Sequence, residues 1–154
     1  MNAVLSYDID NMNPVRIISN DEKPEIPGWA CAGMPQHWYS AFRMAWAHDV
    51  TGYQHLEWKL WDMAIRMAIR HGWKVPTGQE RLRKMARLAI HELIDPARYR
   101  KLESWKLRVA TVGCGKTQWF ALWQARYEMI YGELNDWVNR AFRFIRVKQQ
   151  RGEV

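Results

Sequence analysis

Residues 110–117 read ATVGCGKT, and the interpretation of this stretch decides the fold. It can be a phosphate-binding loop, in which Gly115 lets backbone N–H groups curve around a phosphate, Lys116 reaches the terminal phosphates and Thr117 holds a magnesium ion. It can also be the turn between two short helices. The first position of the motif is Ala110, where the stricter phosphate-loop pattern has glycine. The eight letters alone leave both interpretations open.

The surrounding sequence favours the turn. A phosphate-binding loop needs a strand before it, a helix after it and further strands that carry an acidic magnesium ligand. Residues 118–154 are all that follow the motif, and they read as one helix. The nearest candidate strand, residues 106–112, cannot build a nucleotide-binding sheet by itself. We therefore predict an all-α fold, a helical bundle with a C-terminal helix-turn-helix and a long final helix.

The turn of this helix-turn-helix is expected at residues 113–115. Gly113 lacks a Cβ atom and permits a left-handed backbone conformation. Val109 before the turn, and Trp119 and Leu122 after it, are the apolar residues that would pack two short helices together. An ordinary helical hairpin is the main alternative for this segment.

The outward side of the helix after the turn has the composition of a DNA-reading surface. Its residues are small or polar: Lys116, Thr117, Gln118, Ala121, Gln124 and Ala125. Glutamine can pair bidentately with adenine in a major groove. Four cations near the groove are expected to contact phosphates: Lys106, Arg108, Lys116 and Arg126. Farther along, Arg140, Arg143, Arg146 and Lys148 form a basic stripe that either extends this DNA surface or is an ordinary solvated helix face.

The chain is expected to fall into three segments. Residues 1–28 contain three prolines and several Asn and Asp residues, which predict an extended or partly ordered arm. Residues 29–75 predict a helical hairpin, with helices at 36–48 and 54–71. Residues 76–150 hold the basic helix-turn-helix region and are expected to form one compact domain with the hairpin.

Helical periodicity continues through the basic segment. Thr77 and Glu80 form a capping-box pattern at the start of a helix. That helix presents Leu82, Met85, Ala89 and Leu93 to the core, with Arg81, Arg83, Lys84 and Arg87 outside. Asp95 and Pro96 start the next helix, which is expected to bury Tyr99, Leu102 and Val109, with Trp105 as a further candidate. The final helix runs from about residue 116 to 148, and Gly132 could bend or break it.

Charge is distributed unevenly along the 154 residues. Residues 1–28 carry a net charge of −3 and residues 29–75 a net charge of +2. Residues 76–154 carry 16 lysines and arginines against 8 aspartates and glutamates, a net charge of +8. A clustered positive field attracts the phosphate backbone of nucleic acid, and it would also attract a membrane surface.

The sequence offers little for catalysis or metal binding. The five histidines are scattered, and His91-Glu92 lacks the second histidine that a zinc-protease motif requires. Cys31 and His37 lie at a loose metal-like spacing without a second pair, and the only other cysteine is Cys114. We therefore expect neither an enzyme nor a cofactor. Without a signal peptide or an apolar run of about 18 residues, the expected location is the cytoplasm.

Ten tryptophans run through the chain, mostly at helical spacing. Most are expected to build the core, because large rings bury much apolar surface. A few could face a partner, since tryptophan is enriched at interface hot spots.

One part of the chain resembles a known family. A basic helix, a short turn, the sequence Thr117-Gln118-Trp119 and Tyr127 eight residues later are similar to the C-terminal helix-turn-helix part of the Q antitermination proteins of lambda-like phages. The resemblance covers residues 96–147, about one third of the chain. The Q protein of lambda has a cysteine-rich zinc module ahead of this region, and two distant cysteines cannot supply it. This chain would be a zinc-free variant.

The resemblance implies a phage-encoded regulator of late genes. Such proteins bind DNA near a late promoter, load onto bacterial RNA polymerase paused beside it, and make the elongating enzyme ignore terminators by occupying or narrowing the RNA exit path. Double-stranded DNA and RNA polymerase are then the expected partners. The alternative function is a small phage interaction protein that inhibits or redirects a host complex without sequence-specific DNA binding.

Overall fold

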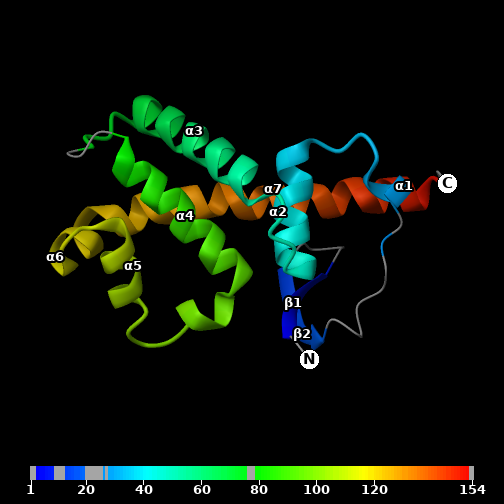
Figure 1. Ribbon diagram of the computed structural model, residues 1–154, viewed down its shortest axis with the longest axis horizontal. Helices are drawn as coiled ribbons and strands as arrows, with labels where there is room; N and C mark the ends of the chain where they lie inside the picture. Colours follow the sequence, from blue (N-terminus) through cyan, green and yellow to red (C-terminus); the bar gives the residue numbers. More distant parts are fainter. Residues whose placement is uncertain (1–2, 9–12, 20–25, 27, 76–78, 153–154) are drawn as a thin grey trace. The chain divides into compact units, whose positions relative to one another are not determined.

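The computed structural model describes residues 3–8, 13–19, 26, 28–75 and 79–152 (Figure 1). The chain divides into two compact units. Unit 1 consists of Met1–Tyr53 and Asn135–Val154, and unit 2 consists of Gln54–Leu134. This division departs from the expected segments, because the two helices of the expected hairpin at residues 29–75 belong to different units.

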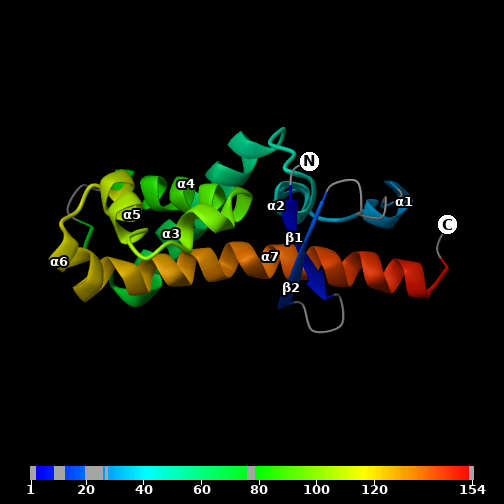
Figure 2. The ribbon, with the colours of Figure 1, turned by 90° about the horizontal axis from the view of Figure 1, so that it is seen from below.

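Unit 2 is built from helices and turns. Its elements are α3 (Tyr53–His71), α4 (Glu80–Ile94), the 3-10 helix η1 (Pro96–Tyr99), α5 (Trp105–Val112), α6 (Lys116–Gln118), the π-helical turn η2 (Trp119–Trp123) and the first part of α7 (Gln124–Gln150). Helix α4 packs against η1 and α5. Figure 2 shows α6 at the N-terminal end of α7, next to α5.

Helix α4 forms where the sequence predicts a helix, although the expected capping residue Thr77 lies outside the described residues. Leu82, Met85 and Ala89 are fully or almost fully buried, as their spacing of three and four residues requires. Arg81 was expected on the outside, but only 8% of its surface is exposed. Its position matches the helical face that also contains Met85, so the periodicity already places it inward.

The helix expected to begin at Pro96 is divided into two elements. Pro96–Tyr99 forms a single turn of 3-10 helix, residues 100–104 form turns, and α5 begins at Trp105. As a result Leu102, expected in the core, is 97% exposed, whereas Val112 is 1% exposed. The change of helix type breaks the register on which the expectation for Leu102 rested.

The final helix begins at Lys116 and continues as α6, η2 and α7 to Gln150. The π turn at Trp119–Trp123 widens one turn of this helix. Trp119 and Trp123 are both buried, and Leu122, which was also expected in the core, is 44% exposed. Gly132 does not break α7, because the helix runs through it without interruption.

Unit 1 contains the C-terminal part of α7 with α1 (Gly28–Cys31) and α2 (Gln36–Ala47). In its core, the ring of Phe142 makes edge contacts with Phe42 and Trp46 of α2 at centroid distances of 5.2 and 5.5 Å. Gly52 allows a close approach, because a Cβ atom there would lie 2.4 Å from the Ser40 hydroxyl. A side chain at position 52 would therefore displace α2.

A short hairpin accompanies these helices. Strands β1 (Ala3–Asp8) and β2 (Asn13–Ser19) pair antiparallel, from Ala3 opposite Ser19 to Asp8 opposite Asn13, with an irregularity between Ser6 and Tyr7. Strand β1 contacts α2. The sequence predicted only an extended or partly ordered arm here, since no alternation of apolar and polar residues indicates a sheet.

The packed helices confirm the all-α bundle, with the hairpin as an addition. The same helices do not confirm a helix-turn-helix. Among the described residues, no helix combines the length and the apolar character that a membrane span needs.

Candidate nucleic-acid interface

The connection between α5 and α6 adopts the backbone that its glycines predict. Gly113 ends α5 in the left-handed region, with φ of 79°, and its N–H donates to the Val109 carbonyl over 2.9 Å. Gly115 is extended and caps the next helix, whose first internal bond runs from the Trp119 N–H to the Gly115 carbonyl over 2.9 Å. A side chain at position 113 would strain the turn, because L-residues rarely adopt this conformation.

The helix that follows the turn has one side exposed to solvent and one buried side. The buried side holds Trp119 and Trp123, each 1% exposed. The expected recognition residues Lys116, Thr117, Gln118 and Ala121 are exposed, and Gln124 is half-buried. The two tryptophans therefore anchor the helix and leave its polar side open to solvent.

Two lysines flank an aromatic ring beside this polar side. The ammonium group of Lys116 lies 4.7 Å from the ring centroid of Trp105, and that of Lys106 lies 5.8 Å from it. Phe120, which is 48% exposed, contacts the same ring at a centroid distance of 6.0 Å. We call Trp105, Lys106, Lys116 and Phe120 the Trp105 cluster. It brings two positive charges to the start of a helix, where free N–H groups also favour an anion. Lys106 also pairs with the carboxylate of Glu103 over 3.1 Å, at an exposed position.

Arg108, which the sequence analysis placed at phosphates, instead belongs to a buried network. Its guanidinium pairs with the Glu92 carboxylate and donates to the Ser104 hydroxyl and the Tyr99 carbonyl. The Tyr127 hydroxyl donates to the other oxygen of Glu92 over 3.2 Å. Burial, and then the charge of Glu92, raise the pKa of Tyr127 far above its usual range. The network joins α4, α5 and α7.

Arg126 is also engaged inside unit 2. Its guanidinium lies 4.7 Å from the ring centroid of Trp123 and 5.3 Å from that of Trp73, and it donates to the Lys74 carbonyl over 3.0 Å. Burial lowers its pKa. A cation held between two rings and a carbonyl supports the helix and is poorly placed to contact phosphate.

A residue that the sequence analysis did not assign to the site supports the turn directly. Arg81 of α4 donates to the carbonyl of Gly113 over 3.0 Å, and its guanidinium stacks 4.9 Å from the ring centroid of Trp123. One buried side chain thus links the turn to the helix that follows it. The sequence could have indicated this role, because helical periodicity places Arg81 on the buried face of α4.

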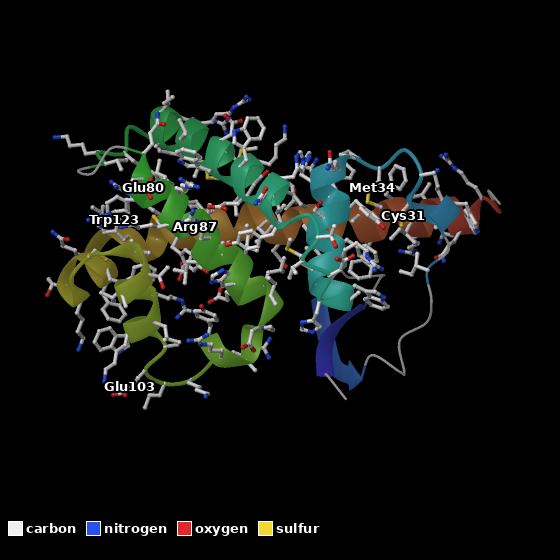
Figure 3. All side chains as sticks on the ribbon, in the orientation of Figure 1. Cys31, Met34, Glu80, Arg87, Glu103 and Trp123 are labelled. Atoms are coloured by element: carbon white, nitrogen blue, oxygen red, sulfur yellow. The ribbon has the colours of Figure 1, made fainter. Side chains whose placement is uncertain are left out.

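The same unit contains a second ion-pair group on α4. The carboxylate of Glu57 in α3 pairs with Arg83 and Arg87. Figure 3 labels Arg87 on α4. These pairs connect α3 and α4. The one negative charge of Glu57 is shared by two arginines, so it offsets one of their two positive charges.

The remaining two predicted DNA-binding residues, Arg140 and Arg143, lie in unit 1. Arg140 pairs with Asp136 over 2.6 Å and stacks 5.7 Å from the ring centroid of Trp38. Arg143 is exposed and makes no hydrogen bond or ion pair with the described residues. The structure therefore brings together Lys106 and Lys116 in unit 2, and Arg140 and Arg143 separately in unit 1.

Groups that could perform metal or thiol chemistry do not gather in the described part of the chain. No three His, Cys, Asp or Glu side chains there lie close enough together to hold a metal ion. Cys31 and Cys114 are free thiols, and burial raises the pKa of each. A raised pKa disfavours the reactive thiolate.

Comparison of the chain with protein-family models, curated proteins and solved structures finds no match. The candidate interface therefore rests on the geometry of its own side chains.

Proposed function

We propose that this chain is a non-enzymatic transcription regulator that binds duplex DNA with the helix beginning at Lys116. The observation that carries this proposal is the exposed row of Lys116, Thr117, Gln118 and Ala121 over a firmly buried tryptophan pair. A recognition helix needs this combination, because its base-reading side must be exposed while its other side is held rigidly.

The geometry suggests a division of roles. Lys106 and Lys116 neutralise phosphates, since both side chains are exposed beside Trp105. Lys106 exchanges its exposed partner Glu103 for a phosphate when DNA binds. Gln118 and Gln124 read base edges, and the small side chain of Ala121 permits close approach to the groove. Arg108 and Arg126 hold the helix in place and do not contact DNA.

The resemblance to the Q antitermination proteins extends the proposal to a biological role. In this role the chain is phage-encoded, acts in the cytoplasm of a bacterial host, and modifies RNA polymerase after binding near a late promoter. Two kinds of partner, duplex DNA and bacterial RNA polymerase, then follow. The zinc module of the lambda protein has no counterpart among the described residues.

A mobility-shift assay at fixed salt tests the DNA-binding step. The cognate sequence is first selected from a random duplex library with the full chain. Lys116→Ala combined with Gln118→Ala should lower affinity for that sequence by about tenfold or more, because each bidentate base contact discriminates by about 1–3 kcal/mol. The matched control is Lys59→Ala combined with Gln54→Ala, two residues at the start of α3. Unchanged affinity in the first variant would contradict the proposed recognition helix.

Exposed apolar residues favour one alternative, a protein that redirects a host complex without reading DNA. Trp58 and Ile69 on α3 are 57% and 78% exposed and lie eleven residues apart, which places them on one helical face. Capture of RNA polymerase from bacterial lysate, with and without nuclease, separates the two functions. Nuclease-resistant capture that Trp58→Ala abolishes, in a chain without DNA affinity, would favour the alternative.

A further inference from the structure

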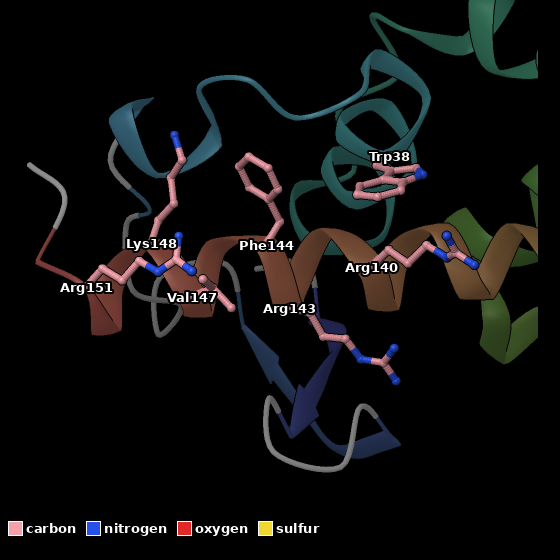
Figure 4. Close-up of a pocket in the computed structure, with 7 residues that line it drawn as sticks. All are labelled: Trp38, Arg140, Arg143, Phe144, Val147, Lys148 and Arg151. Carbon is pink, nitrogen blue, oxygen red and sulfur yellow. The ribbon is translucent and has the colours of Figure 1, made fainter.

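A pocket of about 440 Å³ opens beside the C-terminal part of α7 in unit 1 (Figure 4). Its walls come from Trp38 of α2 and from residues between Arg140 and Arg151. The volume is within the range of about 300–1,000 Å³ that is typical of ligand sites. The DNA surface proposed at Lys116 belongs to the other unit and does not include any of these residues.

The floor of the pocket is apolar and partly aromatic. Phe144 and Val147 are one helical turn apart on α7, and Val147 is 42% exposed. Trp38 contributes an indole that remains half-buried. Figure 4 shows the rings of Trp38 and Phe144 on the same side of α7. Flat rings that remain accessible to solvent suit a ligand that is itself flat.

The rim of the pocket is positive. Four cations line it, Arg140, Arg143, Lys148 and Arg151, and none of the described residues adds a carboxylate. Arg140 lies over Trp38 and shares its charge with Asp136. Lys148 lies 5.2 Å from the ring centroid of Phe144 and donates to the Ala32 carbonyl over 2.5 Å. These two cations are therefore positioned over rings. Arg143 also lines the pocket, but its exposed side chain extends from the other side of α7 than the two rings (Figure 4), where it can meet an anionic group next to the base.

We propose that this pocket binds single-stranded nucleic acid, with one unstacked base against Trp38 and Phe144 and the adjacent phosphates on Arg143 and its neighbours. Sequence-tolerant binding of single strands combines a positive groove with aromatic and arginine planes on which bases stack. Arginine also suits phosphate, because its planar group bonds two oxygens at once. Bases in a duplex are stacked on each other and cannot enter such a pocket.

An acidic peptide is the other polyanion that this rim could attract. A nucleotide matches the pocket better, because it carries a planar ring and an anion in every repeating unit. The pocket likewise offers both kinds of group, with the rings of Trp38 and Phe144 beside the cations at residues 140, 143, 148 and 151. The combination of rings and cations in the pocket therefore favours nucleic acid over an acidic peptide.

Fluorescence anisotropy with the full chain at fixed salt tests this inference. The probes are labelled oligothymidine and oligouridine, so that DNA and RNA are compared directly. Trp38→Leu and Arg143→Glu should each weaken binding by about fivefold or more, the loss expected for one stacked base or a desolvated phosphate contact. The matched controls are Trp58→Leu and Arg70→Glu, which make the same changes at exposed positions on α3 and should change affinity less than about twofold.

Two results would overturn the inference. Equal losses of affinity in Arg143→Glu and Arg70→Glu would mean that net charge alone attracts the single-stranded oligonucleotides. Tighter binding of a labelled, aspartate-rich peptide with one tryptophan, lost in Arg143→Glu, would identify an acidic-peptide site. Because Arg143 is exposed, this variant tests the pocket even if Trp38→Leu fails to fold. Loss of duplex binding in the Lys116 and Gln118 double variant, with single-strand binding intact, would leave this inference standing on its own.

Discussion

A cation in this chain acquires its role from its partners, and the sequence does not show those partners. Arg81, Arg108 and Arg126 belong to the same basic segment as Lys116, yet all three guanidinium groups are held by carbonyls, rings or a carboxylate. Periodicity locates a residue on a helical face, and it correctly left Lys116 exposed. Which carbonyl or ring an arginine meets depends on contacts between distant segments, such as Arg126 with Lys74.

The buried hydroxyl of Tyr127 is expected to lower the stability of unit 2 at high pH. Burial raises the pKa of Tyr127 above the value of about 10 expected in the unfolded chain. Above that pH the unfolded chain loses this proton while the folded chain keeps it, so the free energy of unfolding falls as pH rises. Between about pH 9 and about pH 11 we expect this one group to remove about 1.4 kcal/mol.

Urea unfolding at both pH values measures this effect. Tyr127→Phe should lose about 1 kcal/mol near neutral pH, because its bond to Glu92 is gone. Its stability should then decline less steeply than that of the original chain between the two pH values. Tyr39→Phe serves as the control, since Tyr39 is 42% exposed. Parallel declines in the original chain and in Tyr127→Phe would show that Tyr127 does not cause the pH dependence.

Helices could be predicted from the sequence where the spacing of apolar residues is regular. The prediction was less accurate where the type of helix changes. The spacing of apolar residues correctly located α4 and the final helix, and it correctly buried Trp119 and Trp123. It failed for Leu102 and Leu122, which lie next to a 3-10 turn and within a π turn, respectively. Both turns alter the number of residues per turn, so a fixed period of 3.6 misplaces the side chains beside them.

The uninterrupted course of α7 through Gly132 yields a prediction of increased stability. A Cβ atom added at Gly132 would meet no atom within 4 Å, and the position is helical and exposed. Gly132→Ala should raise the free energy of unfolding by about 0.5–1 kcal/mol, since alanine restricts the unfolded chain and favours helix. Chemical denaturation of the full chain measures the change.

Gly52→Ala is the matched comparison. Its Cβ atom would lie 2.4 Å from the Ser40 hydroxyl, so this variant should lose stability by about 1–3 kcal/mol, as overpacked sites do. If both glycine variants lost stability, α7 would have to depart from regular helix at Gly132. Opposite signs would support the regular helix described for this position.

At the scale of the whole molecule, net charge predicts an affinity for polyanions, but it overstates how many cations are available for binding. The net charge of +8 over residues 76–154 includes Arg83 and Arg87, which pair with Glu57, as well as the buried Arg81 and the half-buried Arg108, which pairs with Glu92. Fewer cations than the sequence suggests can therefore release counterions from DNA. The number of cations that do so can be measured from the salt dependence of the association constant.

That count gives a prediction for the proposed duplex complex. The logarithm of the association constant should fall linearly with the logarithm of salt concentration, by about 0.9 for each phosphate that the protein neutralises. Lys116→Ala should reduce the slope by about 1, because its exposed ammonium group contacts a phosphate in the proposed complex. Gln118→Ala should lower affinity for the cognate sequence without changing the slope, since a base contact releases no counterion.

Arg126→Gln should leave the slope unchanged, because Trp73, Trp123 and the Lys74 carbonyl hold this guanidinium inside unit 2. Titrations at four or more salt concentrations measure these slopes, and an equal reduction in Arg126→Gln and Lys116→Ala would contradict the separation of supporting arginines from DNA-binding lysines.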